Sequence, residues 1–368
     1  MKILFTGGGT AGHINPALAI ANYICEKNPD AEIKFIGTKQ GLEVSLVPKN
    51  GYPLDTVKIH GFSGKSLKTI KSLLELPGAI RASKKIIKQF KPDIVIGTGG
   101  YVCGPVMYAA AKLKIPTLVH ESNAFPGITV RLLSKYVDIT AVGIEEAKNY
   151  LPDAKNVMFT GSPIRTSILT EDSFSARRKL NLDDRPFIVI FGGSLGARDF
   201  NAAAADWICS VCESGKYRIL MATGKNNQFD TVTDRIKSHG LDPDKLDGIE
   251  IREYIYDMDI AMNAADLVMS RAGASTLAEL TAIGKPAILV PSPYVADNHQ
   301  EHNARAIERG GGARVIPEKD LTAESIEKTV SDIVFDPKKL ADMKKSSLKM
   351  GVPDSTEIIY REVLKLTS

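Results

Sequence analysis

The stretch Lys2-Ile-Leu-Phe-Thr-Gly-Gly-Gly-Thr-Ala-Gly-His13 begins with an apolar run, continues through a glycine-rich turn and ends in small residues. A second stretch, Phe187-Ile-Val-Ile-Phe-Gly-Gly-Ser-Leu-Gly-Ala-Arg198, repeats this order. A short apolar run that enters a glycine turn and then a helix is typical of a buried strand in a parallel sheet. Because this unit occurs twice, the sequence predicts an α/β fold with two Rossmann-like domains in tandem.

Short apolar strands alternate with longer helical segments along the chain, as they do in parallel α/β sheets. The first half predicts strands at residues 2–5, 33–37, 93–97, 117–120, 139–142 and 157–159. The second half predicts strands at residues 187–191, 218–223, 249–252, 267–270, 287–290 and 313–315, with helices from residue 321 onward. The Gly and Pro residues of Gly161-Ser-Pro-Ile-Arg165 mark the join. We therefore expect domains over residues 1–163 and 164–349.

The composition is that of a globular protein. The 368 residues are 43% apolar and 24% charged, with a mean hydropathy of −0.07, which excludes collagen, rods and disordered chains. No apolar run approaches the roughly 20 residues of a membrane-spanning helix. Four cysteines give no disulfide framework, so we expect a cytoplasmic chain. The net charge of +4 does not indicate a nucleic-acid partner.

Four glycine-rich loops follow predicted strands, at residues 7–12, 97–104, 192–196 and 270–276. The carboxyl ends of parallel strands share one edge of a sheet, which is where α/β proteins bind ligands. Glycine lets the backbone approach a phosphate, and a helix start offers unpaired N–H groups. Tight turns alone could explain one such loop. Four of them favour an anionic ligand held between two domains.

The first loop also matches a dinucleotide fingerprint, Gly7-x-Gly9-x-x-Gly12. An NAD(P)-dependent oxidoreductase would need an acidic residue after the second strand to bind the ribose, and Thr38-Lys39 stand there instead. An imidazole at His13, directly after the last glycine, is also unusual for such a site. The fingerprint is therefore incomplete.

Five motifs occur in one order: Gly7-Gly-Gly-Thr-Ala-Gly-His13, Gly97-Thr-Gly-Gly-Tyr-Val-Cys-Gly-Pro105, His120-Glu-Ser-Asn123, Gly192-Gly-Ser-Leu-Gly-Ala-Arg198 and Ser270-Arg-Ala-Gly-Ala-Ser-Thr-Leu-Ala-Glu279. From residue 3 to about residue 315 the chain closely resembles the MurG family of peptidoglycan N-acetylglucosaminyltransferases, in glycosyltransferase family 28. The resemblance implies the GT-B fold, in which two Rossmann-like domains with parallel sheets face a central cleft. A C-terminal helix, about residues 350–368, would cross back to the first domain.

The resemblance also implies an activity. The enzyme would move N-acetylglucosamine from UDP-N-acetylglucosamine to the 4-hydroxyl of undecaprenyl-pyrophosphoryl-N-acetylmuramoyl-pentapeptide. Inversion at the anomeric centre would give a β-1,4 link. The first domain would serve the acceptor and the membrane, and the second would bind the donor. The protein would act peripherally at the cytoplasmic face of the bacterial cell membrane, without a cofactor or a metal ion.

Carried over by position, the donor contacts include a carboxylate, a helix start and two glycine loops. Glu279 would accept hydrogen bonds from both ribose hydroxyls, and the helix start would bind the diphosphate. Arg165 and Ser194 would hold the same anion, Ile255 would meet the uracil, and Gln300 would bind the sugar. The residues assigned to UDP-N-acetylglucosamine are Thr10, Ala11, Gly12, Asn123, Arg165, Ser194, Ile255, Ala274, Ser275, Thr276, Glu279 and Gln300.

The candidate catalytic residue is His13. An inverting displacement needs a base for the attacking hydroxyl, and a neutral imidazole can accept a proton near pH 7. A histidine at a helix start could instead donate a hydrogen bond to a sugar or a phosphate, so both roles stay open. Tyr101, His120 and Glu121 would lie on the acceptor side, although a histidine at a strand end is often structural.

The sequence also holds a basic segment and two motifs that resemble metal sites. Residues 65–91 carry eight lysines and arginines against one acid, Glu75, with leucines and isoleucines between them. A solvated helical face is the ordinary explanation, but a lipid-linked acceptor favours contact with an anionic membrane surface. Cys209-x-x-Cys212 stands alone in an alanine-rich segment, so packing explains it better than a metal or redox site. Asp242-Pro-Asp244 is typical of a turn.

Three rival functions share part of these features. A GT-B transferase that glycosylates diacylglycerol would have a similar second domain, but the motifs at Tyr101 and at His120-Glu-Ser-Asn123 disfavour it. A UDP-N-acetylglucosamine 2-epimerase shares the fold without needing this set of motifs. A non-catalytic sensor of nucleotide sugars would keep the same binding residues.

Overall fold

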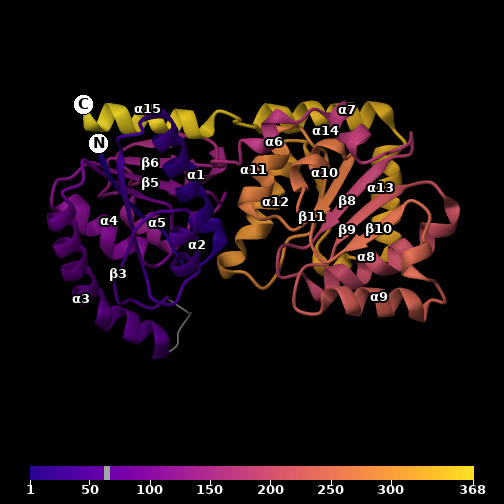
Figure 1. Cartoon of the computed structure of the whole chain (residues 1–368), viewed down its shortest axis with the longest axis horizontal. Coiled ribbons are helices and arrows are strands. Elements are labelled where there is room, and N and C mark those ends of the chain that lie inside the picture. The colour runs from indigo at the N-terminus through magenta and orange to yellow at the C-terminus, as the bar shows by residue number, and fades with distance from the viewer. Residues whose placement is uncertain (62–66) are drawn as a thin grey trace. The chain divides into compact units, whose positions relative to one another are not determined.

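The structure, a computed structural model, describes residues 1–61 and 67–368, with side chains described from residue 74 onward in the second range. The chain divides into two compact units (Figure 1). Unit 1 comprises Met1–Ile164 and Val352–Ser368, and unit 2 comprises Arg165–Gly351.

Within the described residues, unit 1 holds a parallel sheet with the strand order β3-β2-β1-β4-β5-β6-β7. Its first strand pairs on both sides, with Ile3 opposite Ile33 and Ile94. The strands are β1 (Lys2–Thr6), β2 (Glu32–Gly37), β3 (Leu54–Thr56), β4 (Ile94–Gly97), β5 (Thr117–Glu121), β6 (Ile139–Val142) and β7 (Val157–Phe159).

Helices cover both faces of this sheet, because alternate residues of a strand point to opposite sides. Ile3 and Phe5 pack beneath α1 (Ala11–Lys27), α2 (Glu43–Lys49) and α15 (Ser355–Thr367). Leu4 packs on the other side, in a core beneath α3 (Leu67–Phe90), α4 (Cys103–Lys112) and α5 (Ile128–Leu133). The last helix of the chain, α15, thus belongs to unit 1, where it contacts α1.

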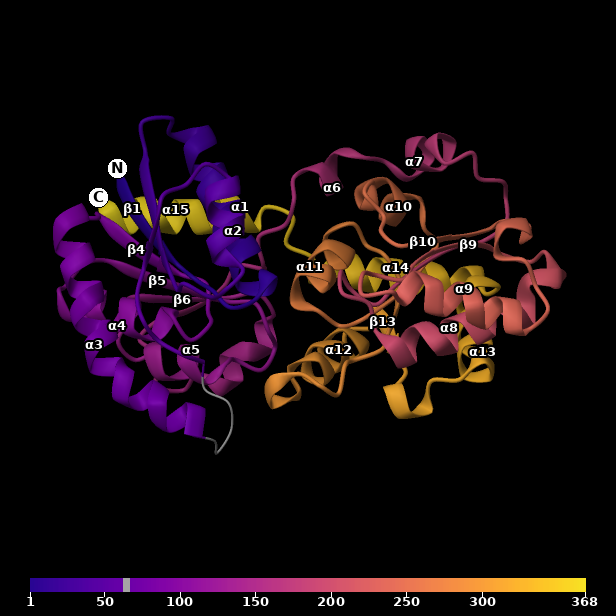
Figure 2. The ribbon, with the colours of Figure 1, turned by 60° about the horizontal axis from the view of Figure 1, so that its bottom comes forward.

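Unit 2 holds a second parallel sheet, with the strand order β10-β9-β8-β11-β12-β13. The strands are β8 (Phe187–Phe191), β9 (Arg218–Ala222), β10 (Ile249–Arg252), β11 (Leu267–Ser270), β12 (Ala287–Leu289) and β13 (Ala313–Val315). One face carries α8 (Arg198–Val211), α9 (Gln228–Ser238) and α13 (Ala323–Val334) (Figure 2). Side chains of these helices, Trp207 of α8 among them, form the main core of unit 2.

Unit 2 holds six further α-helices within the described residues, of which α14 contributes Met343 to the same core. They are α6 (Ser167–Thr170), α7 (Ser173–Lys179), α10 (Met258–Ala264), α11 (Ala274–Ala282), α12 (His299–Arg309) and α14 (Pro337–Met350). Among them α10 packs on α7, and α11 packs on α14.

The predicted α/β class with two parallel sheets is confirmed. Every predicted strand is present, with ends that differ by at most one residue. The sequence analysis missed β3, a three-residue strand at the sheet edge whose residues are only half-buried. A strand this short, with an aspartate at its centre, has too little apolar pattern to be recognised.

Candidate functional site

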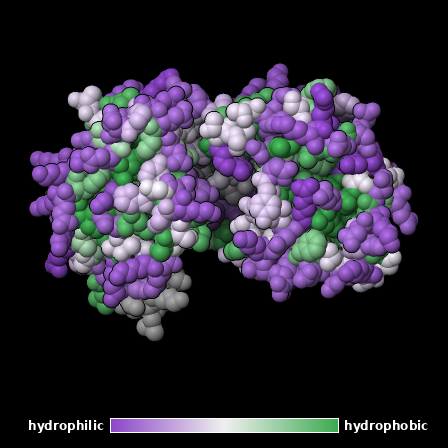
Figure 3. Space-filling model, in the orientation of Figure 1, coloured by the Kyte–Doolittle hydropathy of each residue, from purple (hydrophilic) through white to green (hydrophobic). Residues whose placement is uncertain are grey.

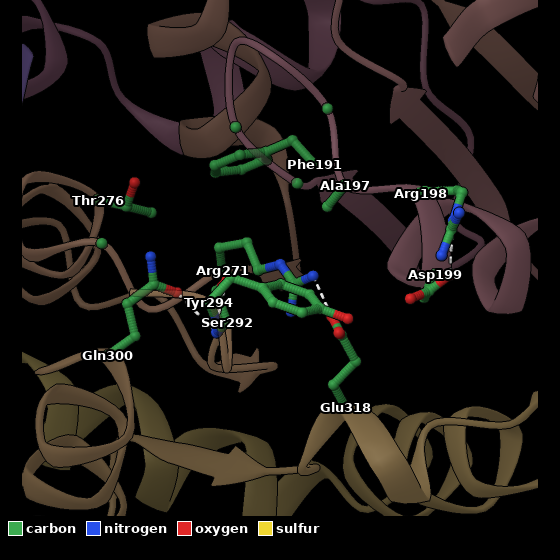
Figure 4. Close-up of a pocket in the computed structure, with 14 residues that line it drawn as sticks. Phe191, Ala197, Arg198, Asp199, Arg271, Thr276, Ser292, Tyr294, Gln300 and Glu318 are labelled. Carbon is green, nitrogen blue, oxygen red and sulfur yellow. Dashed lines mark hydrogen bonds and ion pairs between the residues drawn. The ribbon is translucent and has the colours of Figure 1, made fainter. Parts of the chain in front are cut away.

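A pocket of about 540 Å³ lies in unit 2, at the carboxyl ends of β8 and β11. The glycine loop after β8 forms one wall through Gly192, Gly193 and Gly196, and the start of α11 forms another. Figure 4 shows Thr276 and Gln300 on one side of the pocket and Arg198 with Asp199 on the other. Two of the four predicted glycine loops, at residues 192–196 and 270–276, contribute to this one pocket.

The helix α11 begins at this pocket without a side-chain cap. Its N-cap residue is Gly273, which has no side-chain oxygen, so the first-turn N–H groups at Ala274, Ser275 and Thr276 are not capped by that side chain. Gly273 and Thr276 both line the pocket. A helix start in this position attracts an anion, because unpaired N–H groups and the helix dipole act together.

Glu279 and Arg165 form a bidentate ion pair, with two hydrogen bonds between the guanidinium and the carboxylate. Arg165 donates from Nε to Oε1 at 2.8 Å and from Nη2 to Oε2 at 3.1 Å. The Glu279 side chain is only 13% exposed, whereas Arg165 is 53% exposed. These hydrogen bonds from Arg165 to Glu279 raise the pKa of the guanidinium. Glu279 follows Thr276 by three positions and so shares its helix face.

An ion pair that was not identified from the sequence lines the pocket itself, whereas Glu279 and Arg165 are not among the lining residues. Arg271 contacts Glu318, with both side chains 10% exposed. Arg271 also donates to the carbonyl oxygens of Val290 at 3.2 Å and Pro291 at 3.3 Å. The pair therefore ties β11 to the segments after β12 and β13. Arg271 lies inside a recognised motif, but nothing in the sequence links it to Glu318, 47 positions away.

Three other residues assigned to the sugar donor differ in their position relative to the pocket. Gln300 lines the pocket, where its Oε1 accepts a 2.9 Å hydrogen bond from the Ser292 amide. Ser194 is exposed on the loop after β8 and does not line the pocket. Ile255 is 1% exposed, so its side chain is enclosed by the protein, whereas its neighbours Tyr254 and Tyr256 are exposed. A nucleobase bound in this region would contact the backbone of Ile255 or the side chains of Tyr254 and Tyr256.

In unit 1, the loop after β1 and the loop after β4 lie side by side at the sheet edge. Thr98 donates through its hydroxyl to the carbonyl oxygen of His13 at 2.6 Å. The Tyr101 ring lies against the backbone at Gly9. Thr10 is the N-cap residue of α1, and Ala11, Gly12 and His13 form its first turn. Tyr101 and the residues 10–13 are thus brought together.

The imidazole of His13 is half-buried, and its Nδ1 contacts a carbonyl oxygen and a hydroxyl. The carbonyl oxygen of Gly8 lies 3.1 Å away and the hydroxyl of Thr10 lies 3.2 Å away. A carbonyl oxygen can only accept a hydrogen bond, so this contact requires a proton on Nδ1. In neutral His13, Nε2 is then the basic nitrogen.

His120 and Glu121 are enclosed rather than open to a ligand. His120 is fully buried, with Nε2 3.0 Å from the Gly161 carbonyl oxygen, and burial lowers its pKa. Glu121 accepts hydrogen bonds at 2.9 Å from the backbone and side-chain amides of Asn123 and from the Gly127 amide. Glu121 therefore holds the loop that carries Asn123, whereas His120 ties β5 to the segment at Gly161.

The backbone of the first glycine loop already has an acidic partner in unit 1. The Gly9 amide donates to the buried carboxylate of Glu43 at 3.0 Å. A dinucleotide would need such an amide for its pyrophosphate. This contact, together with the missing acid after β2, disfavours the oxidoreductase alternative.

The two metal-like motifs have structural surroundings. Cys212 donates through Sγ to the carbonyl oxygen of Cys209 at 3.4 Å, and burial raises the pKa of Cys209 to about 11. Asp242 caps the short turn Pro243–Lys245. Across residues 1–61 and 67–368, no group of three or more His, Cys, Asp or Glu residues is arranged to hold a metal ion. Over the same ranges, no helix is both long and apolar enough to cross a membrane.

Comparison with known proteins covers the whole chain. Residues 3–142 match the glycosyltransferase family 28 N-terminal domain, and residues 187–359 match the C-terminal domain of that family. The UDP-N-acetylglucosamine–N-acetylmuramyl-(pentapeptide) pyrophosphoryl-undecaprenol N-acetylglucosamine transferase of Acetivibrio thermocellus is 48% identical over 367 residues, which are 99% of this chain and 98% of that protein.

Solved structures agree with this match. The crystal structure of Acinetobacter baumannii MurG superposes with a TM-score of 0.81 at 26% identity, over 99% of each chain. The UDP-GlcNAc 2-epimerase of Neisseria meningitidis gives a TM-score of 0.67 at 16% identity, over 99% of this chain and 100% of that one, and so shares the fold. Two family domains and a full-length relative of high identity lead to one conclusion: this chain belongs to glycosyltransferase family 28, the family of the MurG N-acetylglucosaminyltransferases.

Proposed function

We propose that this chain transfers N-acetylglucosamine from UDP-N-acetylglucosamine to the 4-hydroxyl of undecaprenyl-pyrophosphoryl-N-acetylmuramoyl-pentapeptide. The observation that carries the proposal is the unit 2 pocket, where a glycine loop and an uncapped helix start meet at the sheet edge. A full-length relative named for this reaction supports the choice of both substrates.

The donor is held in unit 2. The N–H groups at the start of α11 bind the diphosphate, and Glu279 on the same helix accepts hydrogen bonds from the ribose hydroxyls. A carboxylate suits this task because it only accepts hydrogen bonds. Gln300 lines the same pocket and binds the sugar, with Ser292 holding its side-chain oxygen.

In the reaction, the acceptor 4-hydroxyl oxygen bonds to the anomeric carbon of N-acetylglucosamine from the face opposite UDP. The bond between that carbon and the β-phosphate oxygen breaks, and UDP leaves with the bonding electron pair. The helix start of α11 stabilises the added negative charge, and Arg165 contributes when its guanidinium turns from Glu279 toward the diphosphate. The hydroxyl proton passes to a base.

His13 is the proposed base. Its Nδ1 faces the Gly8 carbonyl oxygen and carries the proton, so Nε2 is the basic nitrogen of the neutral ring. Thr10, Ala11 and Gly12 stand in the same helix start, and Tyr101 lies against the adjoining loop on the acceptor side. Asn123 is presented to the sugar by the loop that Glu121 holds.

Unit 1 also provides a basic surface suited to an anionic membrane. The exposed side chains Arg81, Lys85 and Lys88 recur along one face of α3. The acid of that segment, Glu75, is paired with His60 at 2.6 Å and is 13% exposed. Figure 3 shows hydrophilic and apolar side chains intermixed over the side of unit 1 that carries α3. Cations beside apolar groups suit peripheral binding at the cytoplasmic face of the membrane.

The helix α4, which packs against α3, carries a further exposed lysine. Lys112 is exposed and lies 5.4 Å from the Tyr108 ring centroid and 5.6 Å from that of Tyr136. Lys112 and its neighbour Lys135, 5.8 Å from Tyr136, add two cations to the same side of unit 1. The side chains of Lys65, Lys68, Lys71, Ile70 and Leu73, which the basic-segment prediction also used, lie outside the described residues.

The direct test supplies the protein with radiolabelled UDP-N-acetylglucosamine and a lipid-linked muramoyl-pentapeptide. Formation of the labelled disaccharide lipid supports the proposal, and diacylglycerol serves as the control acceptor. Label in diacylglycerol instead would identify the rival transferase. UDP binding without transfer to either acceptor would leave a nucleotide-sugar sensor.

A further inference from the structure

The carboxylate of Glu43 is fully buried beside the first glycine loop, and the proposed reaction does not use it. Its Oε1 accepts hydrogen bonds from the Thr38 amide at 2.9 Å and from the Thr38 hydroxyl at 2.8 Å. Its Oε2 accepts from the Gly9 amide at 3.0 Å. A buried carboxylate with three donors to two oxygens is a built feature, because an ion left unpaired there would be strongly destabilising.

The surrounding backbone is shaped to admit this side chain. A Cβ atom at Gly8 would lie 2.6 Å from Oε1 of Glu43, and one at Gly41 would lie 1.9 Å from Oε2. Neither position could therefore hold a larger residue while Glu43 keeps its place. The glycines of the first loop thus make room for a carboxylate of the chain itself.

The hydrogen bonds from Glu43 continue to His13 through one peptide group. The amide N–H of Gly9 and the carbonyl of Gly8 belong to the same trans peptide bond, so they point in opposite directions. Glu43 binds the N–H side at 3.0 Å, and His13 Nδ1 lies 3.1 Å from the carbonyl oxygen. Hydrogen bonds linked in this way polarise one another.

We propose that Glu43 is a positioning residue that holds His13 in its Nδ1–H tautomer through the Gly8–Gly9 peptide group. The catalytic consequence rests on the proposed role of His13 as base. The negative carboxylate polarises the peptide, which strengthens the carbonyl as an acceptor for Nδ1–H. The ring orientation is fixed at the same time, and Nε2 carries the lone pair that accepts the proton.

The neighbouring hydroxyl is compatible with this tautomer. Thr10 Oγ1 lies 3.2 Å from Nδ1 and can accept from the same N–H. In the opposite tautomer Thr10 could donate to Nδ1, but the lone pairs of Nδ1 and of the Gly8 carbonyl oxygen would then face each other at 3.1 Å. The contact with Gly8 therefore favours the Nδ1–H tautomer.

The first test needs no substrate. Long-range proton–nitrogen correlation spectra of the full chain, labelled with nitrogen-15 histidine and held near pH 8, distinguish the two neutral tautomers. The His13 signal is identified by its loss in His13→Gln. We expect Nδ1–H in the unaltered protein and a shift toward Nε2–H in Glu43→Gln. An Nε2–H tautomer in the unaltered protein overturns the proposal.

Glu43→Gln is the informative variant because it keeps the size of the side chain. Its amide oxygen can serve the two donors of Thr38, but its NH₂ group then meets the Gly9 N–H, and two donors cannot bond. We expect kcat to fall by about 10–10²-fold, as for a displaced catalytic group, with the KM for UDP-N-acetylglucosamine within about twofold. A kcat within twofold of the unaltered protein overturns the proposal.

Thr38→Val is the matched control. It removes the hydroxyl donor to Oε1 and leaves the bond between Oε2 and Gly9 in place. A destabilised protein with an unchanged tautomer and kcat is the expected result. Loss of the tautomer in this variant as well would mean that general packing orients His13. An unaltered protein that transfers no sugar would overturn the proposed function, whereas the tautomer measurement would still judge Glu43.

Discussion

Glu279 and Arg165 share two hydrogen bonds, and this pairing shapes the effect of a substitution at either position. Glu279→Ala removes the acceptor for two ribose hydroxyls, so we expect UDP binding to weaken by about 1.5–3 kcal/mol, the range for hydrogen bonds to a charged group. Titration calorimetry with UDP measures the change. Asp206→Ala is the control, because it removes another ion pair of unit 2 with two hydrogen bonds, between Asp206 of α8 and Arg235 of α9. An unchanged UDP affinity in Glu279→Ala would contradict the assignment.

His13 carries the prediction for turnover. His13→Ala should lower kcat by about 10²–10⁴-fold if the imidazole is the general base, since proton transfer contributes that much. UDP affinity should stay the same, because the donor is held by unit 2. Steady-state kinetics and calorimetry on one preparation separate the two effects, with the exposed His239→Ala as control. A loss smaller than tenfold would assign His13 to positioning.

The buried imidazole of His120 predicts a dependence of stability on pH. Burial lowers its pKa below the usual 6.5, against the smaller opposing effects of Gly161 and Glu121. As the pH falls, the unfolded chain therefore takes up the proton before the folded one. The stability of unit 1 should be full above about pH 6.5 and should fall below it by up to about 1.4 kcal/mol per pH unit.

Hydrogen exchange of the β5 amides between pH 5 and 8 measures this opening free energy. His120→Asn should flatten the dependence, while His239→Asn, at an exposed position, should leave it unchanged. Equal slopes in all three proteins would show that another group controls the acid response.

At the scale of elements, the sequence predicted those strands and helices whose residues form a local pattern. The apolar runs before glycine turns located the strands, and the motif at Ser270 located the start of α11. Glu43 was missed because a glutamate beside Gly41 resembles a surface residue, and its burial depends on Gly8 and Thr38 from other segments. Arg271 and Glu318 were missed for the same physical reason, since long-range pairing leaves no periodic trace in the chain.

The helix α3 carries the membrane prediction. Changing Arg81, Lys85 and Lys88 together to glutamate should weaken binding to anionic vesicles by at least about 3 kcal/mol, since each basic residue near such a surface contributes about 1 kcal/mol. Vesicle co-sedimentation at 0.1 and 0.5 M salt measures the loss, and UDP affinity should not change.

In the matched control, the exposed Lys338, Lys345 and Lys349 of α14 are changed to glutamate. This variant alters the net charge of unit 2 by the same amount as the first variant alters that of unit 1. If both triple variants bind vesicles equally well, α3 is an ordinary solvated helix face.

At the scale of the whole molecule, each unit has its own core, and a single tryptophan reports on one of them. Trp207 is fully buried in unit 2 and donates to Glu327 at 2.8 Å. UDP at 100 times its dissociation constant should raise the unfolding free energy of unit 2 by about 2.7 kcal/mol. The fluorescence of Trp207 measures this unfolding. Hydrogen exchange of the β1 amides should not respond, and ADP serves as the control nucleotide. Protection of β1 without a change at Trp207 would move the donor site to unit 1.

The chain enters unit 2 at Arg165 and leaves it at Gly351, so unit 2 is a single uninterrupted insert within unit 1. The two cut ends of unit 1 lie together, because a Cβ atom at Gly161 would be only 2.4 Å from the Cβ of Val352. Its outer ends also meet, where Thr367 contacts Met1. In unit 1, the residues on either side of the insert are neighbours, and so are Met1 and Thr367. Unit 2 could therefore be deleted and Ile164 connected to Val352 by a short linker. Alternatively, a linker between Thr367 and Met1 would allow a circular permutation. In both cases the sheet of unit 1 would keep its strand order.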